Sequence, residues 1–273
     1  AYSFVAQDAS VLTEAAQTSL GAIVDLNDAL IPTLLISGNT TTNPGVSVSA
    51  NDARSQFGSV VAALNTSLAG RALFGGIDVD RAPLAEAEDM LTALSAAVAA
   101  ETTAAGVEAA VDAWFDTPGG GFETVGYQGS TNDLAPFTLG PNDTTSFAIR
   151  ADNPVLRDVM KTYAMAALVD AGTLAGDLGE QATLLNTAGE RMADANTALG
   201  ALRGELGVVE GRVETALARS NAEIAALELA ETELIEADPF QTATQLQAAE
   251  IRLETLFAIT ARLSRLSLLN YIQ

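Results

Sequence analysis

Two long stretches of the chain repeat apolar residues at alternating intervals of three and four positions, the pattern of a coiled-coil seam. The first covers residues 1–31, with apolar positions at Tyr2, Val5, Ala9, Leu12, Ala16, Ile23, Leu26 and Leu30. The second has them at Leu185, Ala188, Met192, Ala195, Leu199, Leu202, Leu206, Val209, Val213 and Ala216, and recovers the register at Leu227 and Leu234. The second helix, of about 55 residues, would extend ~80 Å. The sequence therefore predicts a mainly α fold, an elongated rod in which these helices run antiparallel.

Signals at the ends of the seams set the expected limits of the helices. The first seam is already running at Ala1, where no residue caps it, so we expect this helix to begin in sequence upstream of the chain. Pro32 is expected to kink or end the helix near Ile31. Asp238 and Pro239 form a cap followed by a first-turn proline, which predicts that the second long helix ends there and that another begins.

The region between the two seams predicts a small inserted α+β domain. Ser49 and Asp52 resemble a capping box, which predicts a helix that stops at Gly70. Further helices are expected at about 83–100, 104–116 and 153–171, the last opened by an Asn-Pro cap.

The β structure is expected in residues 122–151. Residues 122–127 are strand-like, and residues 135–139 and 145–150 flank a loop of turn residues, Gly140-Pro141-Asn142-Asp143. The sequence therefore predicts a strand followed by a hairpin.

The amino-acid composition of the chain excludes most kinds of catalytic site. The chain has 35 acidic residues against 13 basic ones, with no His and no Cys. A Ser-His-Asp triad, a thiol nucleophile, a disulfide and an ordinary zinc site therefore cannot be built from it. The net charge of −22 repels nucleic-acid phosphates and anionic lipids, and apolar runs fall short of the ~20 residues that cross a bilayer. We expect no cofactor, no metal, and neither nucleic acid nor membrane as a partner.

Three local patterns allow a chemical interpretation, and each also has a simpler one. Asp112 and Asp116 flank Trp114 and could form a carbohydrate-cleaving pair of acids, but in so acidic a chain such a pair arises by chance. Asp78 and Asp80 are not followed by the Glu that would complete a twelve-residue calcium-binding loop, so they are expected to lie in an ordinary turn. Lys161 is interpreted as a solvated charge. We therefore expect no enzymatic activity.

The last helix is more apolar than a solvent-facing helix should be. Its seam and its broadened face include Leu246, Leu253, Leu256, Phe257, Leu263, Leu266, Leu268 and Tyr271. Residues 251–273 carry three arginines and one glutamate, whereas the rest of the chain is strongly acidic. No further segment of the chain is left over to cover this helix. These eight residues are therefore predicted to form an assembly interface, unless the helix folds back onto the core of its own chain.

The same C-terminal residues resemble a known family. Asp238, Ala243, Leu246, Leu253, Phe257, Leu263, Leu266-Ser267-Leu268 and Tyr271 are similar to the C-terminal helix of bacterial flagellins and flagellar hook-filament junction proteins. Residues 65–76, which contain Ala-Gly-Arg-Ala-Leu-Phe-Gly-Gly, resemble the corresponding stretch of the junction proteins more than that of flagellins. The family's N-terminal helix, which pairs with the C-terminal one, has no match here, and this departure puts the assembly competence of the chain in question.

The resemblance implies a structural protein of the bacterial flagellum, exported to the cell exterior, that joins hook to filament through polymerisation of its terminal helices. It implies a ring of copies, contacts with a neighbouring hook-associated protein and with flagellin, and a cytoplasmic export chaperone. No catalytic residues are implied. The rod domain is assigned to residues 1–48 and 172–237, the inserted domain to 49–171 and the assembly helix to 238–273. The alternatives are flagellin itself, or a secreted binding protein or enzyme that uses residues 122–151.

Overall fold

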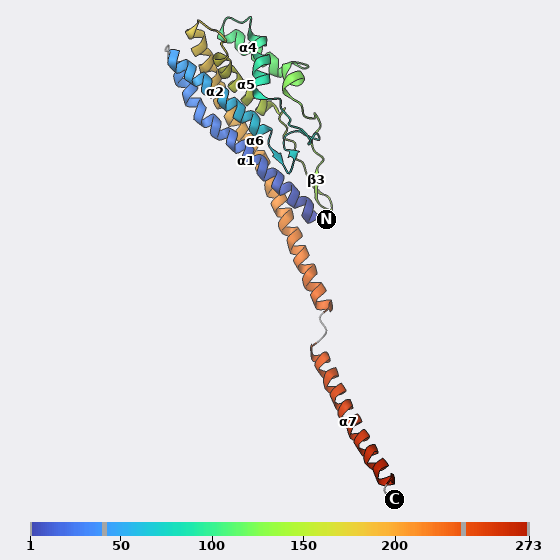
Figure 1. Ribbon diagram of the computed structural model, residues 1–273. Coiled ribbons are helices and arrows are strands. Elements are labelled where there is room, and N and C mark those ends of the chain that lie inside the picture. Colours follow the sequence, from blue (N-terminus) through green and yellow to red (C-terminus); the bar gives the residue numbers. More distant parts are fainter. Residues whose placement is uncertain (1, 40–42, 236–238, 272–273) are drawn as a thin grey trace. The chain divides into compact units, whose positions relative to one another are not determined.

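A computed structural model describes residues 2–39, 43–235 and 239–271, and its fold is mainly α, as predicted (Figure 1). The helices are α1 Tyr2–Gly38, α2 Asn43–Leu64, α3 Ala87–Val98, α4 Ala104–Asp116, α5 Pro154–Asp170, α6 Leu178–Ile235 and α7 Pro239–Tyr271, with a π-helix, η1, at Phe122–Gly126. Two antiparallel hairpins pair β1 Ser67–Leu68 with β2 Arg71–Ala72, and β3 Phe137–Gly140 with β4 Asp143–Thr145. The chain forms two units, residues 1–220 and 221–273, which are described separately.

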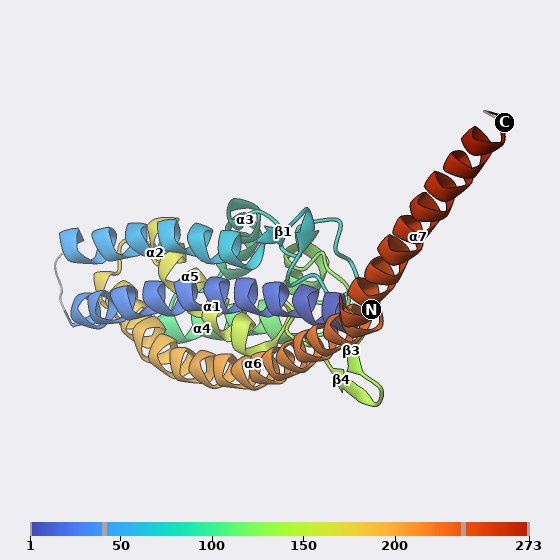
Figure 2. The same ribbon diagram turned by 90° about the horizontal axis from the view of Figure 1, so that it is seen from below.

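The two seams of the first unit pair antiparallel, as the sequence predicts. Gln17 Nε2 of α1 donates to the Arg203 carbonyl of α6 at 2.9 Å, and Asn27 Nδ2 donates to Asn196 Oδ1 at 3.0 Å. Gly189 lies against Leu34, so residue numbers fall along α6 as they rise along α1 (Figure 2). The seam residues of α1, among them Leu20, Ile23 and Leu30, are fully buried. Burial of these seam residues therefore holds the two helices together.

The limits of the first helices differ from the prediction. α1 continues through Pro32 to Gly38, because Leu34 is fully buried and α1 comes very close to α6 at its end. A Cβ on Gly38 would lie 2.5 Å from Asn186 Cβ. This packing offsets the backbone hydrogen bond that a proline removes. Ser49 is no cap either, since α2 begins at Asn43 and the Ser49 hydroxyl is buried 2.5 Å from that of Ser37.

α1 also corrects the expectation about apolar length. By length and composition it could cross a membrane, which the short uninterrupted apolar runs of the sequence did not suggest. Its apolar face is already occupied in the first unit, where Leu20, Ile23 and Leu30 belong to the main hydrophobic cluster. One face of α1 is thus packed in the core, while about two thirds of its most apolar window is not buried.

α5 lies at the centre of the first unit and carries a polar group into the core. Nearly every residue from Val159 to Val169 is buried, and α2 packs along it. The fully buried Tyr163 donates its hydroxyl to Asn27 Oδ1 at 2.8 Å, and Asn27 in turn reaches Asn196. This layer links α1, α5 and α6. A buried polar group of this kind fixes helix register, because a shifted register would leave it without a partner.

The burial of Tyr163 predicts a sensitivity to alkali. Burial raises the pKa of Tyr163 above its ordinary value of 10.0. In the unfolded chain the phenol ionises near pH 10, whereas the folded protein keeps it neutral, so the free energy of unfolding is complete below pH 10 and falls as the pH rises further. We expect Tyr163→Phe to reduce this fall by up to about 1.4 kcal/mol per pH unit. Urea denaturation between pH 8 and 11.5 measures it, and equal pH slopes for both proteins would refute it.

Two features between the helices differ from the prediction. Residues 122–126 form the π-helix η1 and not a strand, and only Tyr127 makes an isolated β-bridge, to Leu84. The ring of Phe122 stacks on Tyr127, with 6.1 Å between ring centroids, and packs against Trp114. α3 begins at Ala87, four residues after the predicted start. The preceding backbone is held extended, since the Asn65 side chain bonds both the N–H and the carbonyl of Leu84. The predicted hairpin is present as β3–β4, but its second strand is shifted: β4 covers residues 143–145 and not 145–150, so only Pro141 and Asn142 of the predicted loop lie between the strands.

Candidate assembly interface

The predicted interface residues lie on α7 in the second unit. The exposed fractions of their side chains run from 54% to 72%, for Leu246, Leu253, Leu256, Phe257 and Leu263. Leu266, Leu268 and Tyr271 belong to the same helix, but their side chains lie outside the described residues. Leu246 and Leu253 are one heptad apart, as are Leu256 and Leu263, so the four leucines share one face of the helix. Such a face is suited to packing against another helix.

The structure adds a second apolar stretch that the sequence analysis assigned to the rod domain. Within α6, Val213, Leu227 and Leu234 occupy equivalent heptad positions. Val213 is fully buried, in a cluster with Ala6 and Ala9 of α1, whereas Leu227 and Leu234 are 69% and 86% exposed. The seam therefore continues into residues whose apolar side chains are exposed. We call residues 221–235 the α6 extension.

Charge is distributed unevenly between these two apolar segments. The α6 extension carries Glu223, Glu228, Glu231 and Glu233 and no basic residue. α7 carries Arg252, Arg262 and Arg265 against Glu250 and Glu254, and none of these arginines forms an ion pair with a carboxylate in the described part of the chain. Unpaired arginines beside an apolar face favour a partner whose surface is acidic as well as apolar.

The carbohydrate-cleaving interpretation of residues 112–116 has no support in the geometry. Arg191 donates to both carboxylate oxygens of Asp112, at 3.0 and 2.7 Å, and these bonds raise the pKa of the guanidinium. Asp116 accepts from Lys161 at 2.6 Å. Trp114 is only 7% exposed, packed against Phe115 and Phe122, so it offers no flat platform for a sugar. These residues hold α4 against α5 and α6.

Lys161 was interpreted wrongly as a solvated charge. It is 4% exposed, and its ammonium group donates to Asp116 at 2.6 Å and to Asp158 at 2.8 Å, with Asp112 at 3.9 Å. Two of these carboxylates come from α4 and one from α5. Helical spacing in the sequence indicates only the partner three residues earlier, Asp158, and gives no sign of Asp112 or Asp116.

The acidic turn at residues 78–80 is also structural. Asp78 accepts a hydrogen bond from Arg81 at 2.7 Å. In residues 2–39, 43–235 and 239–271 no group of three or more potential metal ligands converges.

The stretch of residues 65–76 forms a corner rather than a binding loop. Ala69 and Gly70 both have positive φ, of 50° and 79°, and close the β1–β2 hairpin. Phe74 is fully buried 6.4 Å from the ring of Phe147, and its carbonyl accepts from the Ala151 N–H at 2.9 Å. The motif thus connects α2 to the segment that precedes α5.

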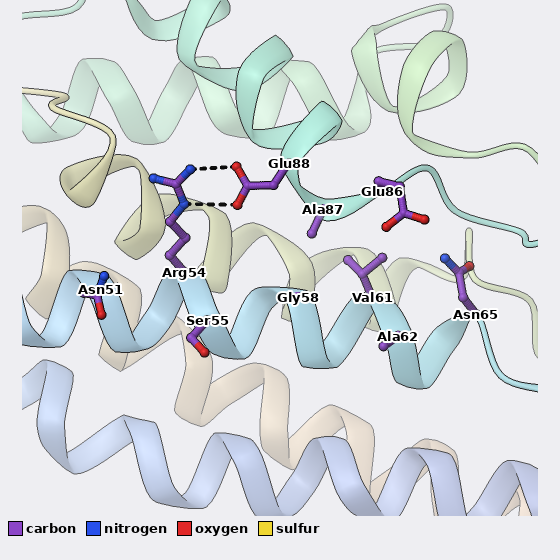
Figure 3. A pocket seen from close by; sticks show the side chains of 10 residues that line it. All are labelled: Asn51, Arg54, Ser55, Gly58, Val61, Ala62, Asn65, Glu86, Ala87 and Glu88. Carbon is purple, nitrogen blue, oxygen red and sulfur yellow. Dashed lines mark hydrogen bonds and ion pairs between the residues drawn. The ribbon is translucent and has the colours of Figure 1, made fainter.

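A groove of about 880 Å³ lies between α2 and the start of α3 (Figure 3). At one end Arg54 makes two bonds to Glu88, at 3.1 and 2.6 Å, and a third to Asp170 at 3.1 Å. The bonds from Arg54 hold the pKa of Glu88 below its ordinary value. Three of the five N–H groups of the guanidinium are therefore used within the protein, and two carboxylates already balance its charge.

Comparisons with known proteins agree with the positions of these features. Residues 190–272 match the model of a family described as the bacterial flagellin C-terminal helical region. The crystal structure of Bacillus cereus FlgL has a TM-score of 0.57 at 17% sequence identity, over 83% of this chain and 91% of that chain, which shows a shared fold. A Vibrio parahaemolyticus structure described as a flagellar hook-associated protein has a TM-score of 0.43 at 13% identity, over 78% and 84% of the chains. No curated protein matches the chain.

Proposed function

We propose that the protein is a structural component of the bacterial flagellum that joins hook to filament, starting from the match of residues 190–272 to the bacterial flagellin C-terminal helical region. The observation that carries the proposal is the exposed apolar surface of the α6 extension and α7, which coincides with the family match. The fold shared with Bacillus cereus FlgL supports the junction role, as does the sequence of residues 65–76.

The proposed mechanism is assembly by burial of the α7 face against helices of neighbouring subunits. Each large apolar side chain removed from water contributes about 1.5–3 kcal/mol, so a heptad seam repeated around a ring supplies a large driving force. Leu246, Leu253, Leu256, Phe257 and Leu263 contribute to this interface, together with Leu266, Leu268 and Tyr271. We propose a ring of copies with a neighbouring hook-associated protein and flagellin on its two sides.

The apolar face of α7 must be kept from binding other proteins before the subunit reaches its site of assembly. An exposed apolar helix associates indiscriminately at cellular concentrations, and we propose that an export chaperone covers it until the chain leaves the cell. The division into a rod domain (1–48 and 172–237), an inserted domain (49–171) and an assembly helix (238–273) remains part of the proposal. The α6 extension belongs functionally with the assembly helix.

Substitution of the seam leucines tests the role of α7. We expect Leu253→Asp combined with Leu263→Asp in the full chain to weaken self-association at least 100-fold, because each buried carboxylate costs several kcal/mol. Sedimentation velocity at matched concentrations measures the change, and motility of the source cell is the functional readout. The matched control, Gln247→Asp with Thr255→Asp, places the same charge on two exposed polar positions of the same helix, outside the face that the four leucines share. Equal self-association of both double variants would refute the interface.

Filament subunits are the alternative, since the family match is to a flagellin region. Immunogold labelling of intact flagella separates the two roles. Label confined to the hook end supports the junction role, and label along the whole filament identifies the protein as flagellin.

A further inference from the structure

One side of α1 carries an apolar strip that the described part of the chain leaves uncovered. We call it the α1 strip. It runs from Val11 to Ile36 at intervals of three and four residues, and none of its positions is charged. Val11 and Ile36 are 44% and 66% exposed, and Ala22 and Ala29 between them are exposed as well. The strip forms one wall of a groove of about 660 Å³, the α1–α2 groove, whose other wall is Ala62, Ala63, Thr66 and Leu68. Spacing of this kind is typical of a helix face that receives another helix.

A second uncharged strip, the α6 strip, runs along α6 from Ala193 to Ala218. Its intervals follow the same order as those of the α1 strip, and it includes Gly200, Gly204, Val208 and Gly211. Val208 is 68% exposed, and a Cβ added to any of the three glycines would meet no described atom within 4 Å outside its own stretch of helix. Each glycine destabilises the helix by about 1 kcal/mol relative to alanine. Because the first unit gains no close contact in return, the glycines are suited to the approach of a helix from another molecule.

The two strips lie on different sides of the α1–α6 pair. α1 turns Gln17 and Gly21 towards Arg203 of α6, whereas the α1 strip lies beside α2 (Figure 2). The α6 strip occupies exposed positions of α6, while the seam positions of that helix are buried. The strips of one chain therefore cannot meet each other, but they can meet between copies. A contact that uses a different face of each partner produces a ring or a filament when it repeats.

Charge favours a contact between unlike strips. α1 carries no basic residue and four acidic ones, Asp8, Glu14, Asp25 and Asp28, so two α1 strips that faced each other would repel. From Arg203 to Arg219, α6 carries three arginines and three glutamates. The α6 strip therefore approaches the α1 strip of another copy with less repulsion than a second α1 strip would. The branched side chains of the α1 strip then face the glycines of the α6 strip, as knobs face holes.

We infer that the α6 strip of one copy packs against the α1 strip and the α1–α2 groove of a second copy, which gives the subunits a side-to-side contact within the first unit. The place of this contact in a ring rests on the proposed function. The contact itself uses only residues of the first unit and is separate from the α7 face.

Cysteine cross-linking of the full chain tests the contact, because the sequence contains no cysteine of its own. Chains with Ala22→Cys, near the middle of the α1 strip, are mixed with chains carrying Gly204→Cys, near the middle of the α6 strip. Packed helices lie about 8–10 Å apart, a distance that a short bis-maleimide spans. We expect a dimer that joins residue 22 to residue 204, at a yield about tenfold above that of either variant alone, because a contact between unlike faces brings no two identical residues together.

The control mixture replaces Ala22→Cys by Ala109→Cys on α4, since Ala109 is exposed and lies on neither strip. Only background cross-linking is expected from it. Absence of the 22–204 dimer at about 1 mM protein, a concentration that half-fills even a contact with a Kd of that size, would overturn the inference. Equal yields in the mixture and in the single variants would also overturn it, since they would mean contact between like faces.

A charge placed in the α6 strip supplies a second test. Gly211→Glu, added to the Gly204→Cys chain, is expected to lower the yield of the 22–204 dimer about tenfold, because it brings a carboxylate against an apolar strip on an acidic helix. Folding is preserved, since glutamate favours a helix more than glycine does. The matched control is Gly58→Glu on α2, another helical glycine with nothing near its Cβ position, which lies in the groove between α2 and α3.

Equal yields with Gly211→Glu and Gly58→Glu would refute the contact. The cross-link reports on the two strips alone, whereas the α7 variants and the immunogold labelling report on the flagellar role. Failure of this contact and failure of the proposed function are therefore distinguishable.

Discussion

A Lys161→Met variant is expected to have a free energy of unfolding about 3 kcal/mol lower than that of the unmodified protein. Removing one partner of a buried ion pair leaves the other charges uncompensated. The ammonium group of Lys161 is nearly inaccessible and contacts Asp116 and Asp158 directly. The value lies at the lower end of the usual range because the carboxylates keep partial contact with water. Urea denaturation followed by far-UV circular dichroism measures it.

Two companion variants make this result interpretable. Arg81→Met removes a cation whose pair with Asp78 is exposed, and it should cost less than about 1 kcal/mol. Adding Asp158→Asn to Lys161→Met should recover part of the lost stability, since it removes one of the unpaired charges. A loss below 1 kcal/mol for Lys161→Met, or no recovery in the double variant, would mean that the cluster does not hold α4 against α5.

Phe74→Ala is expected to cost about 4 kcal/mol of unfolding free energy, as the removal of a buried aromatic ring usually does. Phe74 is fully buried in the corner of residues 65–76 and packs against Phe147. The sequence of this corner resembles that of the junction proteins, and the structure gives it a packing role. The same denaturation measurement applies, with the midpoint and the slope determined separately.

Phe4→Ala provides the matched control for Phe74→Ala. The side chain of Phe4 is 76% exposed, so the identical chemical change should alter stability by less than about 0.5 kcal/mol. If both phenylalanine variants lost the same free energy, the corner could not be a packing centre of the first unit.

Local signals in the sequence predicted the elements that depend on local forces. The pairing of α1 with α6 was predicted from their heptad spacing. The helix at 104–116 was predicted with correct bounds, and the Thr103 hydroxyl accepts from the Gly106 N–H at its start. Asn153 caps α5 as expected, accepting from the Val155 N–H at 2.9 Å. In each case the information lies within a few residues of the element.

The wrong predictions share a dependence on contacts between distant residues. Lys161 meets Asp116, which lies 45 positions away in the sequence, so spacing gave no sign of its burial. η1 looks like a strand in sequence, but ring packing with Trp114 decides its conformation. The exposed α7 positions were readable from their heptads. The exposure of the α6 extension was missed because its leucines share a heptad position with the buried Val213, so spacing does not distinguish them.

The polar layer of Asn27, Tyr163 and Asn196 has a mechanical consequence. If α6 slid by one helical turn along α1, about 5.4 Å, the Asn27 amide would lose Asn196 while keeping its bond from Tyr163, and the unmet hydrogen bond would cost about 1–3 kcal/mol. Leucine contacts alone would re-form after such a slip. A subunit pulled along its long helices therefore resists shear at this layer.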